Sequence, residues 1–228
     1  DALDARENLR ERSPFYLLER FIAGDVFHVD SLIKDGKVIF AGVNTYGRPP
    51  MDVTHQGGVF ISRTIKHGSE DEKNLLKLNR KLVTALGLSY GATHAEFIKS
   101  AESGELYFLE IAARVGGAYI AESLEAASGI NIWREWAGIE IARDDKPYKL
   151  PAVRKEYGGI VLSLARQEYP DTGSYVDEEI VYRIKKRHHV GLVVRSKNLE
   201  RVDELLNSYA RRFSEEFTAI APPPERAE

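Results

Sequence analysis

The chain has no cysteine, one methionine and two tryptophans among its 228 residues. The lack of cysteine excludes disulfide scaffolds, thiolate metal sites and a cysteine nucleophile, and it is consistent with a reducing compartment. Net charge is also small, because 32 Lys and Arg oppose 35 Asp and Glu to give a formal net charge of -3. No cationic excess is available to release counterions from a nucleic acid. We therefore expect no nucleic-acid partner and no membrane-surface partner.

Long apolar runs are absent as well. No stretch reaches the roughly 18 consecutive apolar residues that a membrane-spanning helix needs, and the first residues are polar, unlike a signal peptide. We therefore expect a cytoplasmic protein. The rest of the composition, with 43% hydrophobic and 29% charged residues, is typical of a folded globular chain and argues against a disordered or coiled-coil one.

The length of the chain is large for one average domain and small for two. Residues 1–14 are highly charged and helix-like and begin without an initiator methionine. We interpret them as the remnant helix of a preceding lobe in a longer protein. The pattern of the remaining chain predicts a lobe over 15–150, a smaller C-terminal α+β subdomain over 151–220 and a polar tail over 221–228. The predicted fold class is α+β, with a mostly antiparallel sheet and flanking helices.

Turn and cap signals place the main elements. Asp35-Gly36 lies between alternating segments and predicts a two-residue hairpin turn. Residues 44–58 combine glycine, proline and polar residues without a period, which predicts a functional loop. Ser69 and the acidic residues after it begin a predicted helix that ends at Gly87. The pattern also predicts short helices over 122–129 and 133–142, strands within 157–196, and an amphipathic helix over 199–213.

The segment from Gly91 to Gly117 predicts a second hairpin, and its register brings two carboxylates together. With a three-residue turn at 102–104, Ala101 faces Glu105, and counting outward places Glu96 opposite Glu110. The predicted core face carries Ala95, Phe97, Tyr107, Leu109 and Ile111, and the predicted polar face carries His94, Glu96, Glu110, Ala112 and Arg114.

Opposed like charges destabilise a sheet, so Glu96 and Glu110 are expected to share a proton or a cation. Hard divalent ions with oxygen ligands, Mg²⁺ or Mn²⁺, suit two carboxylates. Arg114 adds a planar cation suited to phosphate or carboxylate. In the alternative interpretation, both carboxylates point to solvent and Arg114 neutralises them. The glycine pair at 116–117, where backbone can approach a ligand closely, favours the site.

These motifs together resemble the ATP-grasp superfamily. The run THAEFI from Thr93 and the run FLEIAARVGG from Phe108 are similar to its metal and phosphate site. The run FYLLERFIAGDVFHVDSL from Phe15 resembles the hinge strand that holds adenine. The resemblance covers residues 16–142, and the remainder fits the amino-acid or peptide ligase branch and its biotin-carboxylase-like relatives.

The resemblance implies an ATP-dependent carboxylate-amine ligase. ATP would phosphorylate a small-molecule carboxylate, and an amine would attack the acyl phosphate to give an amide, ADP and phosphate. ATP and Mg²⁺ (or Mn²⁺) are the implied cofactors, and the resemblance is compatible with a homodimer of the full-length protein. The isolated chain is expected to be inactive, because the phosphate-binding lysines and Gly-rich loop of the family's first lobe do not occur in it.

The resemblance also assigns residues around the nucleotide. Backbone groups of the hinge would bind the adenine edge, and His28 or its neighbour Asp25 would take the place of the acidic residue that contacts ribose in relatives. Asp30, on the same side of its strand as His28, would line the substrate cleft. The implied hinge residues are Glu19, Arg20, Phe21 and Ile22.

The remaining assignments concern the chemistry. Glu96 and Glu110 would hold Mg²⁺, Arg114 would stabilise the transferred phosphoryl group, and Gly116 and Gly117 would lie near the second substrate. Ala112 stands where many relatives have an asparagine metal ligand, which leaves open whether one or two ions bind. Two other interpretations stay open: a nucleotide-binding or regulatory module without turnover, and an interaction domain whose acidic pair is surface decoration.

Overall fold

The computed structural model describes residues 17–48, 53, 58–143 and 147–219. The predicted helix over 1–14 and the predicted tail over 221–228 lie outside these residues. The described chain begins with the hairpin of β1 (Gly24–Lys34) and β2 (Lys37–Tyr46). Asp35 and Gly36 form its turn with φ of 53° and 71°, as a two-residue hairpin of this kind requires. Residues 17–23 form no strand or helix.

The remaining strands extend this hairpin on both sides. They are β3 (Phe60–Thr64), β4 (Gly91–Ser100), β5 (Leu106–Ala112), β6 (Tyr157–Leu164), β7 (Ile180–Arg183) and β8 (His189–Ser196). All pair into one eight-stranded sheet in the order β5-β4-β1-β2-β3-β6-β8-β7, and every neighbouring pair is antiparallel. The predicted α+β class with an antiparallel sheet is confirmed.

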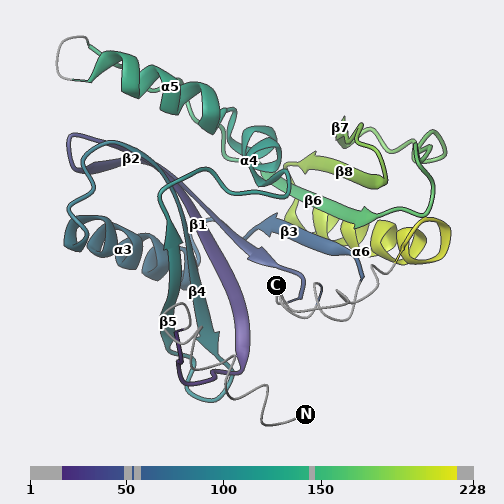
Figure 1. Cartoon of the computed structure of the whole chain (residues 1–228), viewed down its shortest axis with the longest axis horizontal. Helices are drawn as coiled ribbons and strands as arrows, with labels where there is room; N and C mark the ends of the chain where they lie inside the picture. The colour runs from purple at the N-terminus through teal and green to yellow at the C-terminus, as the bar shows by residue number, and fades with distance from the viewer. Residues whose placement is uncertain (1–16, 49–52, 54–57, 144–146, 220–228) are drawn as a thin grey trace, which may run out of the picture.

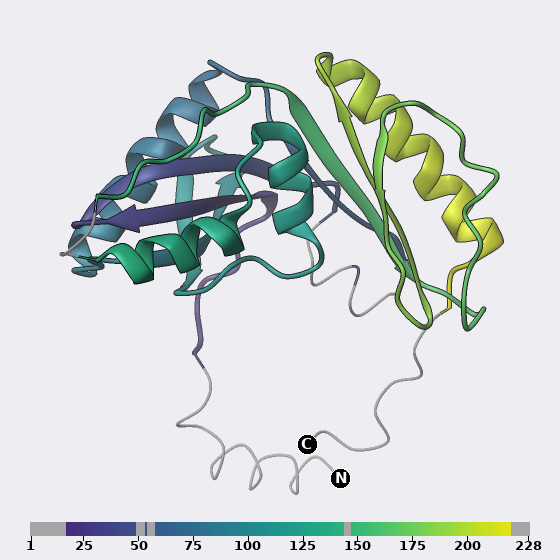
Figure 2. The same cartoon turned by 90° about the horizontal axis from the view of Figure 1, so that it is seen from above.

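Helices cover both faces of the sheet (Figures 1 and 2). They are α3 (Glu70–Ala85), α4 (Ile120–Ser128), α5 (Ile132–Ala142) and α6 (Leu199–Glu216). Helices α3 and α6 lie on one face, and α4 and α5 lie on the other, called here the α4 face. Because side chains alternate along a strand, β1 sends Phe27 and Val29 toward α3 and Leu32 toward α5.

The predicted helix boundaries are confirmed where caps define them. The Ser69 hydroxyl accepts the Glu72 amide at 3.2 Å and begins α3, which satisfies one of the free amides of a first turn. Gly129 has φ of 77° and ends α4, the left-handed position that glycine favours. Among the described helices, none combines the length and apolar character needed to cross a bilayer.

The C-terminal strands continue the same sheet. Ser62 of β3 lies opposite Ile160 of β6, so residues 157–196 extend the sheet of the preceding lobe. They nevertheless have an apolar core of their own, where α6 packs Val202, Leu206 and Phe213 against β6 and β8. The division at residue 151 stays a prediction, supported by the separate core.

The β4–β5 hairpin has the predicted carboxylate pairing but reaches it differently. Glu96 lies opposite Glu110. The turn is one residue longer than predicted, however, because the Ser100 amide donates to the Glu105 carbonyl at 2.9 Å. A β-bulge beyond Phe97 then restores the predicted register.

The bulge also changes the face of the sheet on which residues of β5 lie. Phe108 lies opposite Phe97, and their rings meet edge to face with centroids 6.1 Å apart. Tyr107 lies opposite Ile98, on the α4 face. Leu109 is 37% exposed. The predicted core positions of Tyr107 and Leu109 are therefore wrong, and those of Ala95, Phe97 and Ile111 are confirmed.

Candidate functional site

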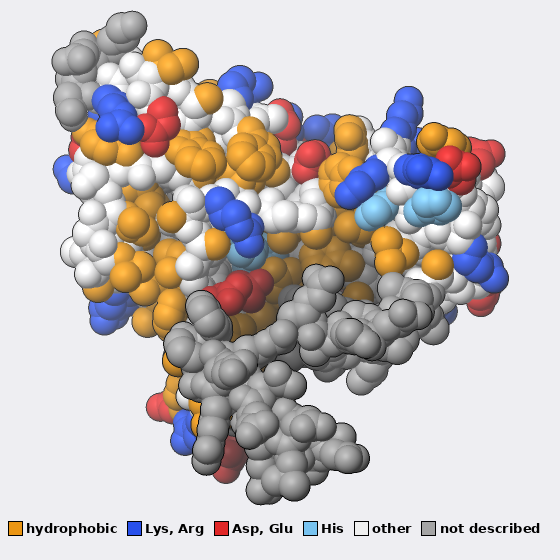
Figure 3. All heavy atoms as spheres, viewed as in Figure 1, with side chains coloured by type: hydrophobic (Ala, Val, Ile, Leu, Met, Phe, Trp, Pro, Cys, Tyr) orange, Lys and Arg blue, Asp and Glu red, His pale blue; other side chains and the backbone are white. Residues whose placement is uncertain are grey.

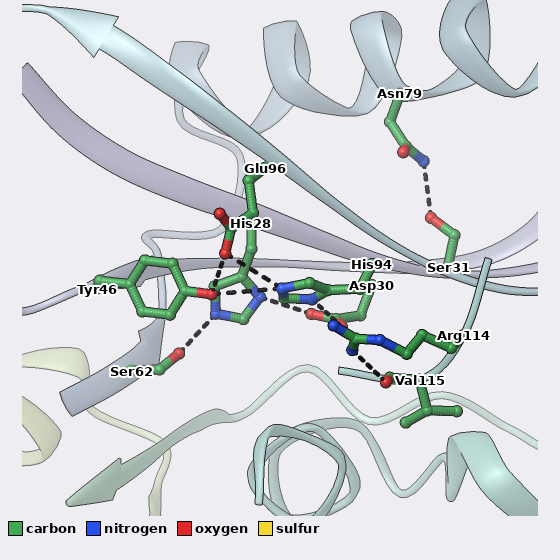
Figure 4. A network of polar contacts seen from close by, with 10 residues as sticks. All are labelled: His28, Asp30, Ser31, Tyr46, Ser62, Asn79, His94, Glu96, Arg114 and Val115. Carbon is green, nitrogen blue, oxygen red and sulfur yellow. Dashed lines mark hydrogen bonds and ion pairs between the residues drawn. The ribbon is translucent and has the colours of Figure 1, made fainter. Parts of the chain in front are cut away.

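A cluster of polar side chains lies on the α4 face where β1, β2, β3 and β4 run side by side (Figure 4). The strand register brings its members together, because His28 lies opposite Glu96 and Asp30 lies opposite His94. Most of these side chains have almost no contact with solvent. The exposed fractions are 0% for His28, 1% for Asp30, 2% for Ser62, 6% for His94 and 9% for Tyr46.

Asp30 lies between the two imidazoles. Its Oδ2 is 2.6 Å from His28 Nδ1, and its Oδ1 is 2.8 Å from His94 Nδ1. Because a carboxylate only accepts hydrogen bonds, both Nδ1 atoms donate to it. Burial by itself would raise the pKa of Asp30, but the charge and hydrogen bond of His28 and the hydrogen bond of His94 outweigh burial and lower it. Asp30 is thus ionised. On the other edge of the His28 ring, the Ser62 hydroxyl lies 2.7 Å from Nε2.

His94 connects Asp30 to Glu96. Its Nε2 is 3.3 Å from Glu96 Oε1, so both ring nitrogens face carboxylate oxygens. Burial opposes the charged imidazole, but the hydrogen bonds to Asp30 and Glu96 prevail and raise the pKa of His94 to about 9. The protonated ring therefore donates to one carboxylate on each side.

Tyr46 holds the same oxygen of Glu96. Its hydroxyl donates to Glu96 Oε1 at 2.5 Å. Burial, together with the charge and hydrogen bond of Glu96, raises the pKa of Tyr46, so the phenol keeps its proton. Burial would raise the pKa of Glu96, and the hydrogen bonds from His94 and Tyr46 lower it instead.

Sequence reasoning missed Tyr46 and Ser62. The predicted loop over 44–58 began too early, because β2 continues through Tyr46 and pairs it with Ser62 of β3. The available signal was the alternation of the preceding strand, which Asn44 and Tyr46 continue on the α4 face. The alternation of the β4 segment predicts the correct face for His94 but no role for it.

The two predicted substrate glycines differ. A Cβ on Gly116 would lie 2.8 Å from Asp30 Oδ1 and 2.9 Å from His94 Nδ1, whereas a Cβ on Gly117 would have no atom within 4 Å. Gly116 is buried and Gly117 is exposed. The Gly116 backbone therefore lies against the Asp30–His94 hydrogen bond, and the approach of this glycine pair to a ligand stays a prediction.

Glu110 and Arg114 are exposed. The face of the molecule in Figure 3 carries acidic and basic side chains between apolar ones. The Arg114 guanidinium donates to the Val115 carbonyl at 2.9 Å. Within the described part of the chain, Arg114 forms no ion pair with Glu96 or Glu110. The alternative in which Arg114 neutralises the two carboxylates is therefore not the observed arrangement.

The donor set fits a hard divalent cation. Glu96 uses only Oε1 in its hydrogen bonds to described residues, so its Oε2 and the Glu110 carboxylate provide oxygens from opposed strand positions, as Mg²⁺ and Mn²⁺ prefer. His28, Asp30 and His94 also offer three ligand atoms within 4.8 Å of one another. Each of those atoms already has a hydrogen-bond partner, so that group is satisfied without an ion.

The predicted hinge residues lie beside the β4–β5 hairpin. The Ala101 amide donates to the Ala23 carbonyl at 2.9 Å, and the Arg20 guanidinium lies 5.9 Å from the centre of the Tyr107 ring. Glu19, Arg20 and Phe21 are exposed, and Ile22 is half-buried. Phe21 is 88% exposed, so its ring is available to a planar ligand.

The positions of His28 and Asp30 do not match the ligand contacts predicted for them. Both are fully enclosed, and the hydrogen-bonding atoms of both are occupied by other side chains of the cluster. They support neighbouring side chains and present no atom to solvent, because β2, β3 and Gly116 surround them. A direct contact with ribose or substrate, as the sequence predicted, is not what this arrangement offers.

Comparison with curated proteins gives a ligase. An L-arginine-specific L-amino acid ligase of Bacillus subtilis is 28% identical over 138 residues, which cover 60% of this chain and 32% of the relative. The chain thus spans about a third of that curated relative. No family model matches the chain.

Solved structures share the fold over most of the chain. The L-amino acid ligase from Bacillus licheniformis has a TM-score of 0.67 at 15% identity, over 97% of this chain and 61% of that one. Phosphoribosylglycinamide synthetase from Anaerococcus prevotii has a TM-score of 0.60 at 16% identity, over 91% and 58%. Biotin carboxylase from Campylobacter jejuni has a TM-score of 0.55 at 18% identity, over 87% and 47%. The resemblance predicted from the motifs is confirmed: the chain has the fold of an ATP-grasp lobe.

Proposed function

We propose that the full-length protein is an ATP-dependent carboxylate-amine ligase that forms an acyl phosphate and then an amide. One observation carries the proposal: Glu96 and Glu110 lie opposite each other on neighbouring strands, and Glu96 is held by Tyr46 and His94. The similarity to an L-amino acid ligase supports amino acids or peptides as the substrate class. A cytoplasmic location and a homodimer stay predictions.

The chemistry needs charge stabilisation rather than a nucleophilic side chain. Glu96 and Glu110 would hold Mg²⁺, which when bound shields the negative charge of the phosphates. A substrate carboxylate oxygen bonds to the γ-phosphorus of ATP as the bond to the β–γ bridging oxygen breaks, and ADP leaves. The amine nitrogen then bonds to the acyl carbon, phosphate leaves and the nitrogen loses a proton. Arg114, exposed two residues beyond Ala112, is assigned to the transferred phosphoryl group.

The hinge supplies the adenine contacts in this proposal. Backbone groups of Glu19 and of Phe21 and Ile22 would bind the edge of the base, and the exposed Phe21 ring would cover its face. Gly117 would present its amide near the second substrate. His28 and Asp30 are assigned to the support of Glu96, because both are buried.

The metal assignment is tested by titrating Mg²⁺-ATP into the full-length protein by isothermal calorimetry. Glu110→Gln should weaken binding, because it removes one anionic oxygen donor from the ion. Glu102→Gln, at an exposed turn position of the same hairpin, is the matched control and should bind like the wild type. Equal affinity for wild type and Glu110→Gln would sink the metal assignment.

A binding or regulatory module is the second candidate, and Ala112 favours it. Ala112 lies opposite His94, at the position where many relatives carry a third metal ligand. An assay of ADP release over pooled amino acids and dipeptides separates the two candidates. Stimulation by an acceptor pair supports the ligase, whereas Mg²⁺-ATP binding without stimulated ADP release supports the module.

A further inference from the structure

Glu96 and Glu110 face each other across one strand pair, but only Glu96 is supported from behind. Two side chains hydrogen-bond its Oε1. No described side chain forms a hydrogen bond or ion pair with Glu110, which is exposed. We propose that Asp30 and His94 are positioning residues that fix the Glu96 carboxylate for its metal ion, an inference that rests on the proposed function.

The contacts form a directed chain from the interior to the site. Asp30 Oδ1 fixes His94 through Nδ1 at 2.8 Å, and His94 Nε2 reaches Glu96 Oε1 at 3.3 Å. Tyr46 donates to the same Oε1 at 2.5 Å. Because both donors engage one oxygen, the carboxylate cannot rotate without losing them, and Oε2 is left for an ion.

Asp30 acts only through His94. No hydrogen bond joins Asp30 to Glu96 among the described contacts, and the other Asp30 oxygen is occupied by His28 at 2.6 Å. Partners of this kind behind a metal ligand set its orientation and basicity, and losing one typically costs about 10–100-fold in metal affinity.

The backbone of Gly116 packs against the hydrogen bond between Asp30 and His94. Its backbone lies so near the Asp30–His94 hydrogen bond that a Cβ would approach both polar atoms below 3.0 Å. Both side chains are also buried, with 1% of Asp30 and 6% of His94 exposed. The carboxylate support is therefore rigid before any ion arrives, which is the condition for a preorganised ligand.

The test measures Mn²⁺ binding to the full-length protein in the presence of saturating ADP, by the electron paramagnetic resonance signal of free Mn²⁺. Asp30→Asn and His94→Gln should each raise the Mn²⁺ dissociation constant roughly tenfold. ADP affinity measured without metal should not change. His67→Gln is the matched control, because His67 also contacts a carboxylate, Glu72, at 3.0 Å, but on α3 and away from Glu96. It should bind Mn²⁺ like the wild type.

The same measurement in a Glu96→Gln background separates positioning from general stability. Once the Glu96 carboxylate is absent, Asp30→Asn should cause no further loss of Mn²⁺ affinity, because residues that act through one partner are not additive. An equal loss in both backgrounds would overturn the inference, as would unchanged affinity of both single variants. Failure of the proposed function looks different, since the wild type itself would then bind no Mn²⁺ with ADP.

A milder variant covers the case in which Asp30→Asn does not fold. Tyr46→Phe removes one hydrogen bond from Glu96 Oε1 and keeps the ring in place against His28, whose centroid is 4.7 Å away. It should raise the Mn²⁺ dissociation constant severalfold, and His94→Gln together with Tyr46→Phe should approach the effect of Glu96→Gln. A double variant that binds Mn²⁺ as the wild type does would refute the positioning role.

Discussion

The two halves of the sheet both pair their strands antiparallel, but they bury different kinds of side chain. At β1 and β4 the α4 face encloses an ionised aspartate and two histidines. At β6 and β8 the face under α6 encloses mainly aliphatic and aromatic side chains, among them Tyr175, Tyr209 and Phe213. Charged groups beside that core, among them Arg201 with Asp177 and Glu179, remain partly exposed at its rim.

The difference shows where the fold buries charged groups, at a cost in stability, beside the predicted metal ligand Glu96. Burying a charge is costly unless hydrogen bonds and partners compensate for lost hydration. The C-terminal core avoids that cost, whereas the cluster behind Glu96 accepts it and compensates every ionised group with a hydrogen bond. We therefore expect substitutions at the two ends to separate stability from metal binding.

The largest effect on stability is expected in the C-terminal core. Phe213 is fully buried, and its ring contacts Tyr175 and Phe217 with centroids 5.5 Å away in both cases. Phe213→Ala should lower the free energy of unfolding by about 3–5 kcal/mol, as measured by urea denaturation, and leave the Mn²⁺ affinity of the folded protein unchanged. Val176→Ala, at a side chain 82% exposed, is the control and should change stability little. A loss of metal affinity in folded Phe213→Ala would contradict the separation of the two ends.

The next largest effect is expected at Gly116, where one substitution should change both stability and metal binding. Gly116→Ala forces a Cβ against Asp30 and His94, and such overpacking typically costs about 1–3 kcal/mol. It should also weaken Mn²⁺ binding, because the clash displaces the support of Glu96. Gly117→Ala, with no atom within 4 Å of its Cβ, should leave both quantities unchanged. Identical behaviour of the two variants, in stability and in Mn²⁺ affinity, would show that Gly116 has no special role.

Much of the fold follows from local signals in the sequence. Asp35-Gly36 fixes the first hairpin, Ser69 begins α3 and Gly129 ends α4, since each of these residues satisfies a backbone requirement by itself. The joining of β3 to β6 is different. It depends on tertiary packing between segments almost a hundred residues apart, which no local pattern specifies.

The candidate site was predictable in part for the same reason. The hairpin pattern predicts that Glu96 faces Glu110, and two deviations, a longer turn and a bulge, cancel to give that register. The burial of His28 and Asp30 could not be predicted, because it depends on Gly116 and on the pairing of β2 with β3. An isolated alternating strand gives no information about what covers its polar face.

A third prediction uses the pH dependence of the buried cluster. Asp30 and Glu96 face His94, with Tyr46 and His28 beside it, and its pKa is raised from 6.5 to about 9. The folded protein thus holds this proton more tightly than the unfolded chain does. The stabilisation is complete below pH 6.5 and is lost as the pH rises through 9. In metal-free urea titrations, the wild type should lose roughly 3 kcal/mol between pH 6 and pH 9.5 that His94→Gln does not lose. A parallel decline in both proteins would exclude His94 as the source.

The smallest effect is expected at the rim of the C-terminal core, and its sign with pH is opposite. Arg201 Nη2 is 2.9 Å from Asp177 Oδ1, and Arg201 Nε is 2.8 Å from Glu179 Oε1. The Tyr209 and Arg201 hydrogen bonds lower the pKa of Asp177, and the Arg201 hydrogen bond lowers that of Glu179. This stabilisation is present above the ordinary carboxyl pKa and is lost as the pH falls through the lowered values.

Solvent screens that arginine, which is about a third exposed, so Arg201→Gln should cost less than about 1 kcal/mol at pH 7. The cost should shrink toward pH 3 as the carboxylates gain protons, and it should shrink in high salt at pH 7. Arg211→Gln on the same helix, where no ion pair joins Arg211 to a described residue, is the control. A cost that persists unchanged at pH 3 would contradict a role for the charge. The Arg201 side chain would then stabilise this end of the sheet by packing its aliphatic stem against the apolar core.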